Sequence, residues 1–485
     1  MNIPVVRLYM LALLMFGSLV YFTSKWAVFD AERLEDRTEN RRPLIAEQQI
    51  PRGSITTADG VLVAESKPEG GGQRPVYVRE YPESTLFGNP VGYSFVNAGR
   101  TGIELSENDL LAGEKNEFAS IIDQLRGAAP EGADLTLTLD AEAQRIATQG
   151  LASAPGDGNG AVVAIEPSTG AVKAMVSTPG FDPNGARDPE NLQRINSSPG
   201  QFNRATQSTY PPGSTMKVVT AAAALDSGEF DPDTTLNADS PKQVSGVPLN
   251  NFGNQSFGEI DMTAALTNSV NTYWAQVGEE LGTETMTEYM ERFGFYRDPQ
   301  LDYPDTQMQP SGVYNSDGRL VREAYDVGRV AIGQGGAEGQ MLASPLQMAE
   351  VAATIANQGA LMRPTFLLEA KDPDGRTIQE LDPDPQQQVI SEEAASQVAE
   401  MMTNVVNEGT ASALSVPTGP GTLAGKTGTA EINLEGLNQP WFIGFAPVDD
   451  PQIAVAVTVE RSQGGTGGEV AGPIATAVMA SLLSG

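Results

Sequence analysis

The first strong pattern along the chain is an uncharged, mostly apolar run near its N-terminus. Residues 8–24 lie between Arg7 and Lys25, and flanking apolar positions extend the run to 4–29. A run of this length can cross a bilayer as one helix. A cleaved signal peptide or a buried core helix would have a similar pattern, but no small-x-small cleavage site follows. We expect an uncleaved anchor with a cytoplasmic N-terminus, because Arg7 precedes the run and acidic residues follow it.

Shorter apolar runs in the first third of the chain predict strands and one capped helix. Residues 52–64 have the pattern of two strands joined by a turn at Asp59-Gly60. Residues 135–140 alternate as a strand does, and Asp140 can cap a helix over residues 141–149.

The remaining apolar runs predict a strand-rich domain that ends in a helix. Residues 160–175 have the pattern of a hairpin around the turn Pro167-Ser-Thr-Gly170. Residues 441–446 and 453–459 predict two further strands, and a final helix is predicted from Pro473 to Leu483. With a linker candidate at residues 127–132, the pattern divides the chain into three parts: an anchor over 1–29, a small mixed N-terminal module over 30–133, and a large C-terminal domain over 134–485.

Composition narrows the chemistry that this chain can perform. The 485 residues include no His and no Cys, and the formal net charge is −32. A Ser-His-Asp triad, a cysteine nucleophile and disulfides are therefore excluded. A structural zinc site is improbable, so we expect no metal and no cofactor. The acidic surface argues against nonspecific nucleic-acid binding, so we expect no nucleic-acid partner.

Without His or Cys, an activated serine needs a Lys or a carboxylate to take its proton. Lys217 follows Ser214 by three residues, in the stretch Tyr210-Pro-Pro-Gly-Ser-Thr-Met-Lys217. Residues i and i+3 share a helix face, so the amine can reach the hydroxyl. A lysine that is removed from water loses its proton more readily and becomes a usable base. Ser214 at a helix N-terminus would also favour developing negative charge.

Two further short motifs follow this pair along the chain. Ser269-Val-Asn271 follows Ser214 by 55 residues, and Lys426-Thr-Gly-Thr429 begins 212 residues after Ser214. The chain has only eight lysines, of which only Lys217 has a serine three positions before it and only Lys426 precedes Thr-Gly.

The trio resembles the motifs of the penicillin-interacting serine transferases, which comprise the penicillin-binding proteins and the serine β-lactamases. The resemblance implies an α/β (α+β) transpeptidase fold, with a central antiparallel sheet flanked by helices. Residues 52–64 and 99–104 resemble the N-terminal module of class B penicillin-binding proteins, although Thr57 and Ala58 depart from that family's usual Asp and Arg. Length, single anchor and short module are similar to the penicillin-binding protein A group of high-GC Gram-positive bacteria.

The resemblance and the chemistry together imply roles for four catalytic residues. Ser214 attacks the carbonyl of a D-alanyl-D-alanine peptide bond, and neutral Lys217 takes the hydroxyl proton. Ser269 relays that proton to the leaving nitrogen, and Asn271 orients both the substrate and Lys217. The acyl-enzyme is then resolved by the amine of a second stem peptide, which cross-links the cell wall.

The third motif is implied to bind the substrate, or a β-lactam in its place. Lys426 supplies positive potential near the substrate carboxylate, and Thr427 and Thr429 bind that carboxylate through their hydroxyls, with Gly428 between them on the strand. The backbone N–H groups of Ser214 and Thr429 are the candidate oxyanion hole.

Other functions stay open for the same motifs. A D,D-carboxypeptidase or a serine β-lactamase would use water as the acyl acceptor, although residues 301–305 show no deacylating Glu-x-x-Leu-Asn box. A non-catalytic sensor or division scaffold would have the same fold but no catalytic activity. The resemblance favours a single-pass protein of the cell membrane with its catalytic domain outside. It implies peptidoglycan stem peptides, β-lactams, a lipid-linked glycan polymerase and proteins of division or elongation as partners.

Overall fold

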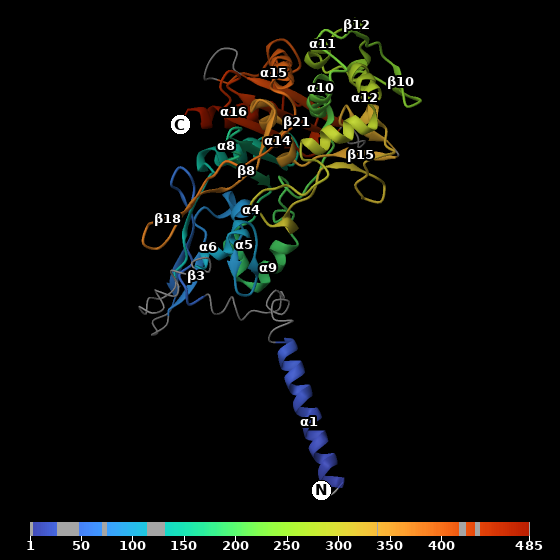
Figure 1. The fold of residues 1–485 in the computed structure, drawn as a ribbon. Coiled ribbons are helices and arrows are strands. Elements are labelled where there is room, and N and C mark those ends of the chain that lie inside the picture. Colours follow the sequence, from blue (N-terminus) through green and yellow to red (C-terminus); the bar gives the residue numbers. More distant parts are fainter. Residues whose placement is uncertain are drawn as a thin grey trace.

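The N-terminal apolar run forms a single helix in the computed structural model, which describes residues 3–26, 48–69, 75–113, 131–336, 338–416, 423–431 and 437–484. Helix α1 (Ile3–Ser24) has no buried residue and a mean hydropathy of 2.0 (Figure 1). Within the described residues it is the one helix that is long and apolar enough to cross a membrane. Residues 27–29 of the predicted anchor and residues 127–130 of the predicted linker lie outside the described residues.

The C-terminal part of the chain is built around an antiparallel sheet. Its strand order is β20-β21-β22-β7-β8, with a short strand β23 paired to β21. The strands are β7 (Gly160–Ile165), β8 (Val172–Thr178), β20 (Ala424–Glu431), β21 (Leu437–Ala446), β22 (Ile453–Val459) and β23 (Ser462–Gln463). Every residue of β7 and β22 is buried. Apart from Thr458, both strands consist of apolar residues and glycine, because helices cover both faces of the sheet.

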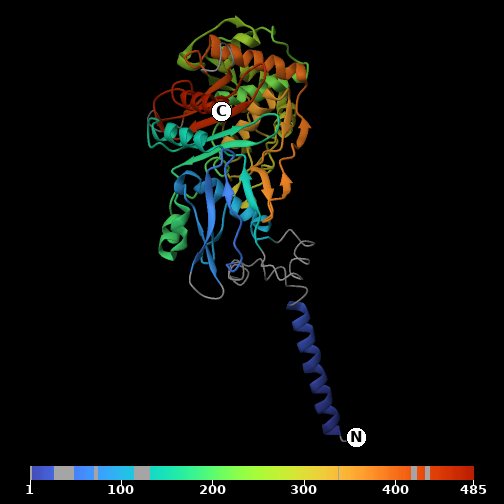
Figure 2. The same ribbon diagram turned by 90° about the vertical axis from the view of Figure 1, so that its left-hand side faces the viewer.

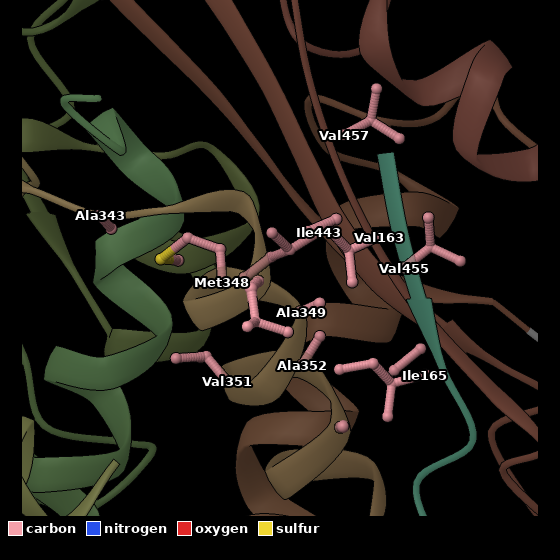
Figure 3. Close-up of a cluster of buried hydrophobic side chains, with 14 of the residues drawn as sticks. Val163, Ile165, Ala343, Met348, Ala349, Val351, Ala352, Ile443, Val455 and Val457 are labelled. Carbon is pink, nitrogen blue, oxygen red and sulfur yellow. The ribbon is translucent and has the colours of Figure 1, made fainter. Parts of the chain in front are cut away.

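Helix α14 (Pro345–Ala356) covers one face of this sheet. Figure 3 shows Ala352 of this helix on the side of Val163 and Ile165 of β7, whereas the side chain of Met348 points the other way, towards Ala343. On the other face, α8 (Ala141–Ala152) and α16 (Ala471–Leu483) pack on each other and on the sheet. Asp140 caps α8 as predicted, its side chain accepting a hydrogen bond from the N–H of Ala143. The last helix begins at Ala471, two residues before the predicted start; Pro473 still lies in the first turn, where no backbone N–H is needed.

A second sheet, which we call the pedestal sheet, lies below the first in Figures 1 and 2. Its strand order is β18-β17-β6-β1-β2-β3. The strands are β1 (Ile55–Thr56), β2 (Leu62–Glu69), β3 (Val76–Glu80), β6 (Asp134–Leu137), β17 (Leu367–Lys371) and β18 (Thr377–Glu380). The predicted strand at 135–140 therefore pairs with the N-terminal module, because β6 runs parallel to β1 and antiparallel to β17. The pedestal sheet takes strands from both sides of the predicted boundary at 133/134, which itself stays a prediction.

A buried ion cluster ties the N-terminal strands to a pair of short helices. Glu104 of α5 (Ile103–Ser106) accepts hydrogen bonds from Arg52 Nε at 2.7 Å and from Arg79 Nε of β3 at 2.5 Å. Arg79 also donates to the carbonyl of Gly53 at 2.7 Å. Burial alone would raise the pKa of the Glu104 carboxyl, but the two guanidinium groups outweigh it and lower this pKa to about 2.

Helices and small strand pairs complete the structure around the two sheets. The helices are α4 (Gly88–Val91), α6 (Asn108–Leu111), α9 (Pro189–Asn196), α10 (Lys217–Asp226), α11 (Met262–Thr267), α12 (Asn271–Arg292), α13 (Val327–Val330) and α15 (Glu392–Asn407). The 3-10 turns are η2 (Ser84–Leu86), η3 (Pro183–Arg187), η4 (Gly213–Met216), η5 (Phe252–Asn254) and η6 (Asp305–Gln307). The small strands are β4 (Ser94–Phe95), β5 (Gly99–Arg100), β9 (Leu236–Asn237), β10 (Lys242–Val244), β11 (Val247–Leu249), β12 (Glu259–Ile260), β13 (Gly312–Tyr314), β14 (Gly335–Gly336), β15 (Gly339–Leu342), β16 (Ala360–Met362) and β19 (Pro385–Gln388).

Candidate active site

The turn before Ser214, residues 210–213, is held in place by three other elements. The backbone of Tyr210 pairs with that of Ala343, and the indole Nε1 of Trp441 donates to the carbonyl of Pro211 at 3.0 Å. The N–H of Gly213 donates to the carbonyl of Gly333 at 3.1 Å. Ser214 then lies in η4, a 3-10 turn that runs directly into α10. The predicted helix start is therefore a tighter turn than an α-helix, with Lys217 as the first α-helical residue.

Glycines allow this turn to approach its neighbours closely. Gly213 has φ +54°, which a residue with a side chain rarely adopts. A Cβ on Gly333 would lie 2.0 Å from the Gly213 carbonyl oxygen, and a Cβ on Gly428 would lie 2.7 Å from the carbonyl oxygen of Pro212. The space for the Gly213 Cβ is 3.3 Å from the carbonyl carbon of Thr429. Strand β20 therefore lies directly against the turn that carries Ser214.

The amine of Lys217 is the centre of the site. This side chain is fully buried, and its Nζ lies 2.9 Å from Ser214 Oγ. The same Nζ lies 2.7 Å from the backbone oxygen of Ser269, 2.7 Å from Asn271 Oδ1 and 3.3 Å from Ser269 Oγ. Burial lowers the pKa of Lys217 well below its usual value, and the nearby charge of Lys426 lowers it further. The structure thus brings the other three predicted catalytic side chains within hydrogen-bonding distance of the Lys217 nitrogen.

Ser269 connects the two lysines of the site. It lies in the turn between α11 and α12 and has φ +58°, an uncommon conformation for a residue other than glycine. Its Oγ accepts a hydrogen bond from Lys426 Nζ at 2.9 Å. Lys426 is also fully buried, and burial lowers its pKa to about 7. The strained turn therefore places one hydroxyl between two amines that are both easier to deprotonate than an exposed lysine.

The hydroxyls of the third motif have different surroundings. Thr427 is buried, and its Oγ1 lies 2.6 Å from Oγ1 of Thr410. Thr429 is half-buried at the edge of β20, where its Oγ1 accepts a hydrogen bond from the N–H of Gly467 at 3.3 Å. Thr429 is therefore more accessible than Thr427.

Some supporting residues were not predicted. The carbonyl of Asn250 accepts a hydrogen bond from Asn271 Nδ2 at 3.1 Å, and Asn251 Oδ1 accepts one from the N–H of Thr272 at 2.9 Å. The hydroxyl of Tyr210 donates to Glu460, which also receives a hydrogen bond from Arg204. These residues lie in loops without a chemical motif, so only their contacts reveal them. Among the described residues, no group of three or more carboxylates is placed to hold a metal ion.

Sequence comparisons match most of the chain to known proteins. Residues 160–480 match the penicillin binding protein transpeptidase domain, and residues 52–135 match the penicillin binding protein A dimerisation domain. The chain is 34% identical to the peptidoglycan D,D-transpeptidase PbpA of Mycolicibacterium smegmatis, over 94% of both chains. It is 28% identical to the peptidoglycan D,D-transpeptidase MrdA of Escherichia coli, over 76% of this chain and 62% of that protein.

Comparison of the fold with solved structures identifies the same protein family. It matches the ceftriaxone acyl-enzyme of penicillin-binding protein A from Mycobacterium tuberculosis with a TM-score of 0.79 at 30% identity, over 90% of this chain and 100% of that chain. It matches the penicillin G acyl-enzyme of the same protein with a TM-score of 0.77 at 31% identity, over the same shares of both chains. The chain therefore belongs to the penicillin-binding protein transpeptidases with this type of dimerisation domain, and it is a peptidoglycan D,D-transpeptidase, a serine acyltransferase of cell-wall synthesis.

Proposed function

We propose that Ser214 is the acylated serine of this transpeptidase and that Lys217 is its general base. The arrangement around Lys217 Nζ carries the proposal. A neutral amine has two hydrogens and one lone pair, and the Ser269 carbonyl and Asn271 Oδ1, both at 2.7 Å, are acceptors without a hydrogen of their own. They take the two hydrogens, which leaves the lone pair for the Ser214 hydroxyl at 2.9 Å.

The acylation step follows from this arrangement. Ser214 Oγ attacks the carbonyl carbon of a D-alanyl-D-alanine peptide bond while its proton passes to Lys217. Ser269, whose Oγ lies between Lys217 and Lys426, relays a proton to the nitrogen of the leaving D-alanine. The backbone N–H groups of Ser214 and Thr429 are the candidate oxyanion hole, and the close approach of the Ser214 turn to β20 supports this assignment.

The carboxylate of the substrate is proposed to bind along β20. Lys426 contributes positive potential, and Thr429, which is the more accessible threonine, donates its hydroxyl. Thr427 supports the same edge through its contact with Thr410. Gly428 has no side chain, which keeps the edge close to the Ser214 turn. A β-lactam carboxylate would take the same position, and the solved acyl-enzymes of the related penicillin-binding protein A support β-lactam binding by this chain.

The acyl group is proposed to pass to the amine of a second stem peptide. The relatives named as D,D-transpeptidases support an amine acceptor over water. Helix α1 is proposed to be an uncleaved anchor that leaves the catalytic domain on the outer side of the cell membrane, where cell-wall substrates lie. A lipid-linked glycan polymerase and proteins of division or elongation are proposed partners, because cross-linking acts on newly made glycan.

Covalent labelling tests the role of Ser214. The full chain in detergent is incubated with a fluorescent penicillin beside Ser214→Ala, with Ser208→Ala as a matched control outside the three motifs. We expect stoichiometric label on the parent and on Ser208→Ala, and no label on Ser214→Ala. Equal labelling of Ser214→Ala would refute the proposal. Supplying an amine acceptor and water together to the acyl-enzyme then distinguishes transfer from hydrolysis.

A further inference from the structure

An uncharged cavity of about 250 Å³ lies between the N-terminal module and the segment that leads to Ser214. Its lining has five carboxamide side chains, two hydroxyl residues and two phenylalanines, and no charged residue. Three other cavities of the described residues each include arginine or glutamate in their lining. In a chain with a net charge of −32, a cavity lined only by neutral polar and aromatic groups indicates a neutral ligand.

In each of four carboxamides, one polar atom forms a hydrogen bond within the protein and the other polar atom has no partner among the described residues. Asn89 Nδ2 donates to the carbonyl of Gly200 at 3.0 Å, and Gln201 Nε2 donates to the hydroxyl of Tyr93 at 3.2 Å. Their oxygens have no hydrogen-bond partner among the described residues.

In the other two of these four carboxamides, the oxygen forms the hydrogen bond and the NH₂ group is left. Gln207 Oε1 accepts a hydrogen bond from the N–H of Asn203 at 2.8 Å, and Gln307 Oε1 accepts one from the N–H of Gly102 at 3.2 Å. Their NH₂ groups are unengaged within the part of the chain that the structure describes. The residues that line the cavity therefore keep two amide oxygens and two NH₂ groups that no described residue engages.

Two aromatic rings complete the lining. Phe181 is buried, whereas the side chain of Phe202 is 43% exposed. A sugar ring has apolar C–H faces that pack on aromatic rings, and its hydroxyl and acetamido groups both donate and accept hydrogen bonds. A stem peptide, by contrast, carries charged groups that this lining would leave without a partner.

We propose that this cavity binds one N-acetylated sugar residue of a peptidoglycan glycan strand. The inference rests on the proposed function, because it assigns a binding site for the glycan part of that substrate. Its volume lies below the ~300 Å³ at which pockets for drug-sized ligands begin, which suits a single sugar ring with the rest of the strand on the surface.

The cavity is also connected to the catalytic turn. Thr206 donates its hydroxyl to the carbonyl of Gln307 at 2.7 Å, and the N–H of Gln309 donates to the carbonyl of Thr206 at 2.9 Å. Ser214 follows Gln207 by seven positions, so the cavity wall lies within ~25 Å of the nucleophile. A glycan held here would keep its attached peptide near Ser214.

Calorimetric titration with a peptide-free tetramer of N-acetylglucosamine tests the site. The titrated protein is the full chain in detergent with Ser214→Ala, so that binding is measured without acyl chemistry. We expect saturable binding that Gln307→Leu and Phe202→Ala each weaken by about 10-fold or more, since each removes oriented contacts. The matched controls Gln452→Leu and Phe252→Ala change exposed residues elsewhere and leave the affinity unchanged. A glucose tetramer, which lacks the acetamido groups, should bind at least ~10-fold more weakly.

Three results would overturn the proposal: no saturable binding, equal affinity in all variants, or equally effective competition by a stem peptide without sugar. Penicillin labelling of Gln307→Leu and Phe202→Ala in the Ser214 background verifies that both variants are folded. If Ser214→Ala abolishes labelling but no glycan binds, only this inference fails. If glycan binds but Ser214→Ala still takes the label, only the proposed acyl-serine mechanism fails.

Discussion

Two clusters of buried positive side chains are stabilised in opposite ways. In the N-terminal module, Arg52 and Arg79 share the buried carboxylate of Glu104. In the catalytic cleft, Lys217 and Lys426 are fully buried, and neither forms an ion pair with any described residue. A guanidinium does not lose its proton in a protein, so its burial requires a carboxylate. An ammonium can lose its proton, so burial lowers the pKa of both lysines instead.

The buried arginines thus keep a charge that stabilises the fold, whereas the buried lysines can lose their proton. The arginine cluster stays ionised and connects strands and helices of the N-terminal module. Lys217, the proposed base, is easier to deprotonate because no carboxylate of the described residues stabilises its protonated form. The following predictions test this distinction, from the largest expected effect to the smallest.

Lys217→Arg should separate the charge at this position from its basicity. Arginine keeps the positive charge but cannot accept the proton of Ser214, so we expect the rate of acylation by labelled penicillin to fall by ~10²–10⁴-fold. The control Lys371→Arg changes an exposed lysine and should leave the rate unchanged. Full activity of Lys217→Arg would mean that charge, and not proton transfer, is what the lysine supplies.

Glu104→Gln should reveal the structural role of the arginine cluster. It leaves two buried guanidinium groups without their carboxylate, and we expect the free energy of unfolding to fall by about 3–5 kcal/mol in urea titration. Glu69→Gln, which breaks an exposed pair with Arg187, should cost about 0–1 kcal/mol. A similarly small loss for Glu104→Gln would show that the cluster is not needed for stability.

The two clusters should affect stability in different pH ranges. Between pH 7 and 10.5 the unfolded chain holds the Lys426 proton more tightly than the folded chain, so folding becomes more favourable as pH rises. Lys426→Met should reduce this slope by up to ~1.4 kcal/mol per pH unit, and Lys371→Met should not. The contribution of Glu104 to the free energy of unfolding changes at acidic pH instead. It is complete above pH 4.5 and is lost as the pH falls towards 2. Parallel urea titrations across pH measure both, and an unchanged slope in Lys426→Met would contradict the lysine assignment.

The smallest effect concerns the two threonines of β20. Thr429→Val should slow acylation by ~10-fold or more, since it removes an accessible hydroxyl that we assign to the substrate carboxylate. Thr427→Val removes a buried contact with Thr410 and should instead lower stability by about 1 kcal/mol, with less effect on the rate. If Thr427→Val has the larger kinetic effect, the carboxylate contacts Thr427.

The cleft could be predicted from sequence because its chemistry lies in contiguous motifs. Ser214 and Lys217 are one turn apart, and the scarcity of lysine made the third motif conspicuous. The residues that hold these motifs in place, such as Asn250 and Gly333, lie in loops, where contacts depend on tertiary packing.

The arginine cluster could not be predicted for a related reason. Arg52, Arg79 and Glu104 are far apart in the sequence, and each resembles an ordinary surface charge until the fold brings them together. The central strands were predicted because both of their faces are buried and their sequences are continuously apolar. The short strand β6 was expected from its alternation, but its partner β17, more than two hundred residues later, left no local signal.

The position of β17 and β18 has a consequence for how the chain must be made. These strands extend the pedestal sheet beside β6, and Figure 2 shows them in orange next to the cyan strand β6. Ribosomal synthesis produces β1, β2, β3 and β6 first, and the sheet stays open at its β6 edge until β17, which ends at residue 371, has emerged. An open strand edge is a site for wrong pairing. The β6 edge of the nascent N-terminal module therefore stays unpaired until much of the catalytic domain has been synthesised.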